Sequence, residues 1–270
     1  MASVKKITSL QNPSIKEAVR LMKRPERDAM KLFLIEGYRE LLHAVSAHVQ
    51  IETLFFCPEL FLGENESSLI AILKERDTDL LECSKEVFAK LSYRDRPDGL
   101  IAIARQMEYS WDLFTSENVP FFVVAEAIEK PGNLGTILRS SDAVNVDGLF
   151  VCDRCTDLYN PNVVRASVGT LFTVKAKEVT SQELLAWLKA RNIQIVAATP
   201  SAEKEFTEVD LTKPVAIVVG TEQLGLTDFW MQQADIRVKI PMLGKANSLN
   251  VGSATTLLLY EVIRQRRQAV

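Results

Sequence analysis

Three segments in the second half of the chain combine glycines with polar side chains that could do chemistry. They are residues 133–139 (NLGTILR), 220–226 (GTEQLGL) and 240–251 (IPMLGKANSLNV). Glycines such as Gly220 and Gly225 take backbone angles that other residues resist, and they let backbone approach a ligand closely. An arginine such as Arg139 can clamp a phosphate through its planar guanidinium fork. The residue types therefore suit a site in which the backbone contacts a ligand and an arginine side chain binds a negatively charged group.

Each segment also has a plain structural interpretation. Asn133 follows Pro131 and Gly132, where a helix is expected to start, so it could be an N-cap. Arg139 could be a surface charge, and residues 220–225 a turn without a ligand. Ser248 and Asn250 could cap the helix that follows them. Local sequence leaves both interpretations open at every one of these positions.

The order, spacing and flanks of the three segments resemble the signature motifs of the SpoU (TrmH) branch of the SPOUT methyltransferases, over roughly residues 119–267. That family transfers a methyl group from S-adenosylmethionine to a ribose 2′-oxygen of RNA and needs no metal. The resemblance implies a catalytic group of Asn133, Arg139, Glu222, Ser248 and Asn250. It also implies that the cofactor is held by Val219, Gly220, Ile240, Met242 and Leu249.

The motif arginine has been cast in the family as the group that activates the 2′-hydroxyl. A guanidinium stays protonated in proteins, so Arg139 is a poor base. We expect it to clamp the neighbouring phosphate and to stabilise developing alkoxide charge, while the phosphate or a water receives the proton. The third motif departs from the family at one position, because Gly252 stands where members commonly have serine.

The sulfonium is already a good leaving group, so the protein must mainly align and slightly activate a poor nucleophile. Alignment by binding, helped by preorganised dipoles, can account for several kcal/mol of such a barrier.

The elements that position these segments form a β/α pattern in the second half. Apolar strands are expected at 121–125, 148–152, 193–198, 215–219 and 236–240, and helices at 133–144, 181–191 and 253–267. Continuous apolar strands separated by helices predict an α/β fold with a parallel sheet covered on both faces. The deep trefoil knot comes only from the resemblance, since knots are otherwise almost absent from folds.

The first part of the chain predicts a small α/β domain over residues 1–105, joined by a linker at 106–118 to a catalytic domain at 119–270. Helices are expected at 13–22, 27–45, 68–74 and 85–91, and strands at 51–57 and 99–104. Residues 33–41 (FLIEGYREL) resemble the entry to the L30e-like substrate-binding domain found upstream of many SpoU catalytic domains. That domain type binds structured RNA.

The formal net charge of −3 argues against a generally basic surface, but the distribution is uneven. Residues 1–39 hold nine lysines and arginines against four acidic residues, a local charge of +5, and such a patch can engage phosphates. The resemblance favours ribosomal RNA, most simply 23S rRNA, as the partner. The alternatives are a tRNA 2′-O-methyltransferase, a SPOUT enzyme acting on a base nitrogen, and a non-catalytic ribosome-assembly factor.

Several other function classes are disfavoured. No run of about 18 apolar residues exists and no signal-peptide core follows the first residues, so we expect a cytoplasmic protein and no membrane partner. Cys152 and Cys155 have C-x-x-C spacing without a second pair, which disfavours a metal site. His43 and His48 are expected to be structural or exposed. Dinucleotide and P-loop glycine motifs are absent from the sequence.

The expected C-terminal helix is more apolar than one face of a surface helix requires. Leu257, Leu258, Leu259, Val262 and Ile263 all lie within two turns of it. We therefore expect a homodimer, because a second subunit would cover part of this surface.

Overall fold

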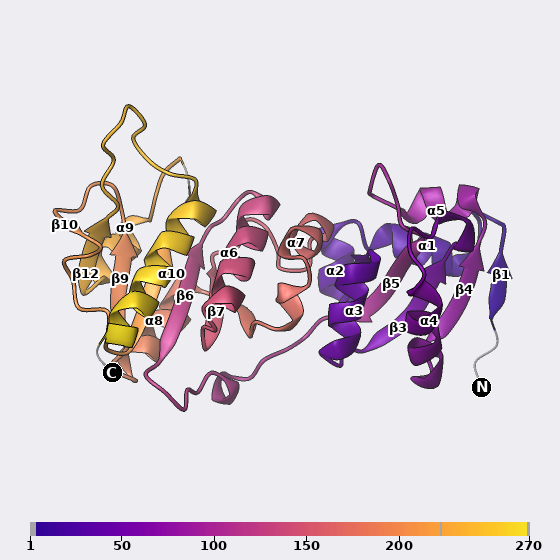
Figure 1. Cartoon of the computed structure of the whole chain (residues 1–270), viewed down its shortest axis with the longest axis horizontal. Coiled ribbons are helices and arrows are strands. Elements are labelled where there is room, and N and C mark those ends of the chain that lie inside the picture. Colours follow the sequence, from indigo (N-terminus) through magenta and orange to yellow (C-terminus); the bar gives the residue numbers. More distant parts are fainter. Residues whose placement is uncertain (1–3, 222, 269–270) are drawn as a thin grey trace. The chain divides into compact units, whose positions relative to one another are not determined.

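The computed structural model describes residues 4–221 and 223–268. Its contacts divide the chain into two compact units. The first unit is Met1–Met107 with Tyr159–Thr173, and the second is Glu108–Leu158 with Val174–Val270. Each unit has its own sheet (Figure 1). The boundaries 1–105, 106–118 and 119–270 drawn from the sequence stay a prediction.

The first unit contains a mixed sheet of five strands in the order β1-β4-β3-β5-β2. Strands β1, β4 and β3 are parallel, and β5 runs antiparallel to both β3 and β2. The strands are β1 (Lys5–Ile7), β2 (Leu32–Glu36), β3 (Ile51–Phe56), β4 (Asp79–Cys83) and β5 (Leu100–Arg105). Strands β1 and β4 were not predicted from the sequence.

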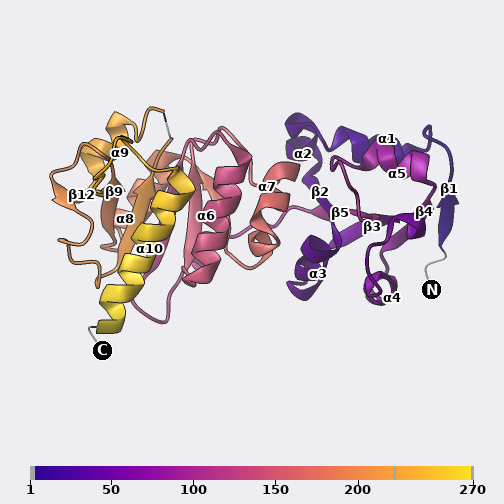
Figure 2. The same cartoon turned by 45° about the horizontal axis from the view of Figure 1, so that its top comes forward.

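Helices cover this sheet on two faces. They are α1 (Pro13–Arg20), α2 (Arg24–Met30), α3 (Tyr38–Ser46), α4 (Glu66–Glu75) and α5 (Lys85–Leu91). Helices α1 and α5 pack one face through a core that includes Ile15, Leu21 and Phe88. In Figure 2, α3 and α4 lie on the opposite face.

The single helix predicted over residues 27–45 is wrong. The segment splits into the end of α2, the strand β2 and the start of α3. Lys31, at φ 55°, ends α2, and Gly37, at φ 115°, turns the chain into α3. Strand β2 is buried along its whole length and pairs with β5. Its short apolar run also fits the helical spacing of the residues on either side, so the pattern alone did not separate the strand from the two helices.

A segment from the second half of the sequence belongs to the first unit. It carries α7 (Pro161–Ser167) and a 3-10 turn (Thr170–Phe172). The ring of Tyr159 lies 4.7 Å from that of Phe33, and its hydroxyl donates to the carbonyl of Met107 at 2.8 Å. Sequence patterns did not predict this packing because these contacts join residues 52 or more positions apart.

The second unit is built on a parallel sheet of seven strands, in the order β10-β12-β9-β11-β6-β7-β8. They are β6 (Phe121–Glu126), β7 (Gly148–Cys152), β8 (Ala176–Val179), β9 (Gln194–Ala198), β10 (Lys204–Glu205), β11 (Val215–Val219) and β12 (Ile236–Lys239). The α/β fold with a parallel sheet is confirmed. The trefoil knot remains an implication of the family.

Helices lie on both faces of this sheet, as the sequence predicted. They are α6 (Pro131–Ala143), α8 (Ser181–Lys189), α9 (Asp228–Gln233) and α10 (Val251–Gln268). Helices α6 and α10 run side by side in both views (Figures 1 and 2). Helices α8 and α9 contribute Trp187 and Trp230 to one core with Phe122 and Val218.

The stretch of sequence between β5 and β6 includes a short 3-10 turn, Trp111–Leu113. The ring of Trp111 stacks at 5.4 Å on that of Trp187 and at 5.7 Å on that of Phe150. Phe114 is buried beside them. Part of the segment 106–118 therefore belongs to the core of the second unit. No helix within the described residues has the length and apolar character to cross a membrane.

Candidate active site

The first motif lies at the start of α6. The helix begins at Pro131 after Lys130, because proline's fixed φ and missing N–H suit the first helical position. Asn133 is the third residue of the helix, so its interpretation as an N-cap is wrong. Arg139 is exposed and has no ion-pair partner within residues 4–221 and 223–268.

The third motif meets the first through a pair of asparagines. The Oδ1 atom of Asn250 accepts the backbone N–H groups of Gly252 at 3.0 Å and Ser253 at 3.4 Å, so Asn250 does cap α10. Its Nδ2 atom donates to Oδ1 of Asn133 at 3.0 Å. Two residues 117 positions apart are thus joined at the starts of two neighbouring helices.

The departure at Gly252 has a packing reason. A Cβ atom there would lie 2.8 Å from Cγ2 and 2.9 Å from Cβ of Thr136, far inside normal contact. One turn further along, the hydroxyls of Ser140 and Thr256 are 2.6 Å apart. Glycine at 252 therefore leaves room for the side chain of Thr136 and lets α6 and α10 approach closely enough for the asparagine pair to form.

The second motif forms a tight loop after β11. The backbone of Thr221 and that of Gly225 exchange hydrogen bonds of 3.1 and 3.0 Å. A Cβ atom on Gly220 would lie 2.4 Å from the carbonyl oxygen of Gly225, and Gly225 has φ of 69°. Both glycines are thus required by the loop itself. Val219 is buried at the end of β11, and Glu222 lies outside the described residues.

A buried carboxylate that the sequence did not reveal anchors this loop. Glu126, at the end of β6, accepts the Thr227 backbone N–H at 2.9 Å and its hydroxyl at 2.6 Å. Burial raises the pKa of the Glu126 carboxyl above its ordinary value of 4.5, and the two bonds from Thr227 lower it in part. The only sequence signal for this role was a charged residue at the end of an apolar strand.

The loop between β12 and α10 carries the remaining predicted residues. Ile240 and Met242 are half-buried, whereas Ser248 is exposed. Leu249 is 37% exposed and Leu243 is 99% exposed. This loop therefore presents apolar side chains to solvent beside the starts of α6 and α10.

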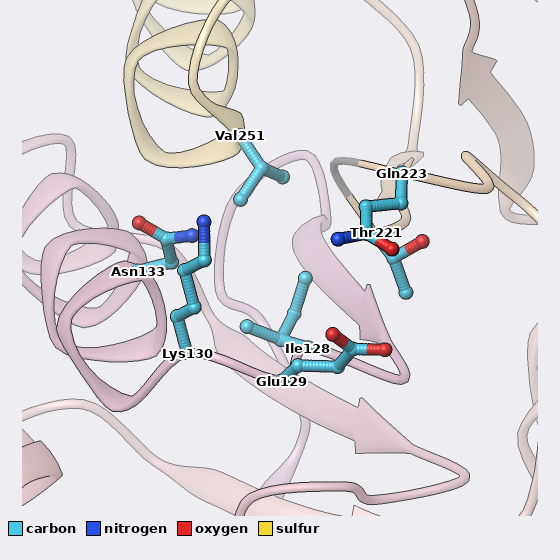
Figure 3. Close-up of a pocket in the computed structure, with 7 residues that line it drawn as sticks. All are labelled: Ile128, Glu129, Lys130, Asn133, Thr221, Gln223 and Val251. Atoms are coloured by element: carbon cyan, nitrogen blue, oxygen red, sulfur yellow. The ribbon is translucent and has the colours of Figure 1, made fainter.

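A small pocket, partly open to solvent, lies where the three segments converge (Figure 3). It is at the carboxyl ends of β6 and β11, which is where ligands bind in open α/β sheets. Among the described residues, Asn133 is the predicted site residue that lines it, and Thr221 and Val251 are the chain neighbours of others. The described residues that line it are Ile128, Glu129, Lys130, Asn133, Thr221, Gln223 and Val251.

The two cysteines with C-x-x-C spacing differ in exposure. Cys152 is buried at the end of β7 and Cys155 is exposed, and burial raises the pKa of the Cys152 thiol. Among the residues described, no group of three or more histidines, cysteines and carboxylates could hold a metal ion. His43 is exposed, and its ring lies against Gly169.

Comparisons with known proteins agree with this geometry. Residues 120–260 match the SpoU rRNA Methylase family, and residues 12–102 match the MRM3-like substrate binding domain. A 23S rRNA (uridine(2479)-2′-O)-methyltransferase of Streptomyces viridochromogenes is 31% identical over 243 residues, which are 87% of this chain and 83% of that protein.

Solved structures extend the similarity over nearly the whole chain. A crystal structure of an RNA 2′-O ribose methyltransferase is 42% identical, with a TM-score of 0.84, and the match covers 97% of this chain and 99% of that one. An AdoMet-bound rRNA methyltransferase from Sinorhizobium meliloti is 29% identical, with a TM-score of 0.87 and coverage of 97% and 98%. The chain belongs to the SpoU family of S-adenosylmethionine-dependent RNA 2′-O-methyltransferases.

The residues at the pocket suit this cofactor. Its walls combine apolar Ile128 and Val251 with the charged Glu129 and Lys130. S-adenosylmethionine likewise combines apolar surface with a charged amino acid end. The neighbouring loop also exposes apolar side chains, Leu249 among them.

Proposed function

We propose that this protein methylates a ribose 2′-hydroxyl of ribosomal RNA, most simply the 23S rRNA of the large subunit. The S. viridochromogenes relative carries that activity in its name, and a second relative is a 23S rRNA (guanosine(2553)-2′-O)-methyltransferase of Bacillus subtilis. The N-terminal match to a substrate-binding domain fits a large structured RNA.

The hydrogen bond between Asn133 and Asn250 carries the catalytic part of this proposal. It brings the first and third motifs together at one pocket, with Arg139 on the exposed surface of the same helix. Such an arrangement can hold a ribose and its phosphate beside a bound cofactor. Alignment of this kind is the main contribution the reaction needs from the protein.

The cofactor supplies an activated methyl group on a sulfonium. In the proposal, Val219 and Gly220 contribute backbone at the end of β11, while Ile240, Met242 and Leu249 surround the adenosine part. Glu222 and Ser248 complete the catalytic group, Glu222 by holding its loop.

Arg139 acts in the proposal as a phosphate clamp. Its guanidinium holds the phosphate next to the target ribose by two parallel hydrogen bonds and stabilises negative charge on the 2′-oxygen. The proton passes to that phosphate or to a water, because a guanidinium does not give up its own proton in a protein.

The first unit supplies affinity for RNA in this proposal. Lys16, Lys23, Lys31 and Arg39 are exposed on it, as phosphate contacts require. Deleting residues 1–105 should preserve binding of S-adenosylmethionine but weaken binding of RNA. The intact protein should also lose RNA affinity steeply with salt. Equal RNA affinity of the truncated and intact proteins would contradict this assignment.

The proposal includes a cytoplasmic homodimer. On α10, Leu257 is 45% exposed and Tyr260 is 52% exposed, one turn apart on the same side. These two side chains are suitable for contact with a second subunit. Sedimentation at micromolar concentration tests the dimer, because a single species near 30.3 kDa would reject it.

The test of the function is methyl transfer to rRNA by the wild type and by variants of Arg139. Arg139→Ala should abolish transfer and leave cofactor binding nearly unchanged, and Arg139→Lys should also fail because a point charge cannot form the fork. Arg267→Ala, an exposed arginine at the far end of α10, is the matched control. Activity of Arg139→Ala at saturating RNA would refute the clamp.

The choice of substrate is tested by mapping 2′-O-methyl groups with and without the gene. Loss of a site in 23S rRNA supports the proposal, whereas loss of a site in tRNA alone supports the tRNA alternative. A non-catalytic factor would show no change in either RNA and no heat of binding with S-adenosylmethionine.

A further inference from the structure

The orientation of the Asn133 amide follows from the helix that Asn250 caps. Oδ1 of Asn250 faces two backbone N–H donors, so this atom must be the oxygen. The other end of the Asn250 amide is therefore the donor, and the atom of Asn133 that receives it must be Oδ1. Asn133 consequently turns its Nδ2 donor away from Asn250.

That donor lies beside a cation. Lys130, which immediately precedes α6, lines the pocket together with Asn133. Figure 3 shows the ammonium nitrogen of Lys130 and the amide nitrogen of Asn133 on the same side of the pocket, with Thr221 and Gln223 across from them. The start of α6 adds the positive end of a helix dipole to this side.

The opposite charge is also present at the pocket. The carboxylate of Glu129 belongs to the same lining, and in Figure 3 it points toward Thr221, away from Lys130. One side of the pocket thus offers donors and a cation, and another offers an anion. A ligand that carries both a carboxylate and an ammonium group, as at an amino acid end, would find a partner of opposite charge for each of them.

We propose that Lys130 and Asn133 bind the carboxylate of the amino acid end of S-adenosylmethionine, and that Glu129 faces its ammonium group. This assignment rests on the proposed function. It adds Lys130 and Glu129 to the residues that contact the cofactor. Neither residue belongs to the three motifs.

Calorimetry with two ligands tests the assignment without RNA, so its result is separate from the choice of RNA substrate. The ligands are S-adenosylmethionine and its decarboxylated form, which lacks only the carboxylate. The wild type should bind the decarboxylated ligand about tenfold more weakly, as expected for loss of a charge-assisted hydrogen bond. Lys130→Met should bind S-adenosylmethionine about tenfold more weakly and should no longer distinguish the two ligands.

Lys213→Met is the matched control, because Lys213 is an exposed lysine of the same unit outside the pocket. It should bind both ligands as the wild type does, and Lys130→Arg should retain most of the preference. Equal binding of the two ligands by the wild type would overturn the assignment. So would a Lys130→Met variant that keeps cofactor affinity but loses RNA affinity with a reduced salt dependence, since Lys130 would then contact an RNA phosphate.

Discussion

Replacement of Gly252 by alanine should lower the rate of methyl transfer more than the stability of the protein. The added Cβ would lie 2.8 and 2.9 Å from two atoms of Thr136, so α6 and α10 must separate by several tenths of an ångström. Overpacking of this kind costs about 1–3 kcal/mol, and the gain in helix propensity from glycine to alanine offsets about 0.5–1 kcal/mol of it. The net loss of unfolding free energy should therefore be about 0–2.5 kcal/mol.

The loss of activity should be larger than this loss of unfolding free energy suggests. The separated helices would lengthen the 3.0 Å bond between Asn133 and Asn250, and misplacement of reacting groups by about 1 Å can cost about a hundredfold in rate. We expect methyl transfer at saturating RNA and cofactor to fall by about ten- to a hundredfold.

The assay can isolate the second unit, because all three tryptophans of the chain, Trp111, Trp187 and Trp230, lie in it. Urea unfolding followed by tryptophan fluorescence therefore reports the stability of this unit alone. Gly132→Ala is the matched control, since a Cβ there meets no atom within 4 Å. It should leave activity nearly unchanged and should gain at most about 0.5–1 kcal/mol of stability, from helix propensity alone.

The decisive comparison is whether a second substitution, at Thr136, restores the Gly252→Ala protein. Thr136→Ala removes the contact at 2.8 Å but keeps a Cβ at 2.9 Å, so it should restore the Gly252→Ala protein only in part. Thr136→Gly removes both atoms and should restore activity further, although glycine in the helix costs about 1 kcal/mol. Wild-type activity of Gly252→Ala, or failure of Thr136→Gly to raise its activity, would refute the reasoning.

Two further variants test contacts that support the site. Glu126→Gln should change the pH dependence of stability. The pKa of Glu126 is raised in the folded protein, so the folded protein holds this proton more tightly than the unfolded chain does. Wild-type stability therefore falls as pH rises from 4.5 through the folded-state pKa. The variant should lack this fall, and parallel unfolding curves against pH for the two proteins would exclude it. Arg266→Met should destabilise the second unit by about 2 kcal/mol, because its guanidinium donates to the carbonyls of Val119, Pro120 and Lys213 at 2.7, 3.0 and 2.9 Å. Arg267→Met is its control, and equal urea midpoints for the two variants would show that these bonds contribute little.

The sequence alone determined the architecture of the second unit well. Central strands of a parallel sheet are covered on both faces, so they appear as short continuous apolar runs such as Val215–Val219 and Gly148–Cys152. The same rule misled in the first unit, where the buried strand Leu32–Glu36 lies between two helices. Its apolar residues fit a helical spacing equally well, and only pairing with β5 decides between the two.

The motifs likewise located the site in sequence without showing how it is held together. Tertiary structure alone decided that Asn133 pairs with Asn250, that Gly252 faces Thr136, and that Glu126 anchors Thr227. Each of these contacts joins residues about a hundred or more positions apart. Local patterns record the solvent exposure and backbone preferences of neighbouring residues, whereas the distance between two helices depends on every side chain packed between them.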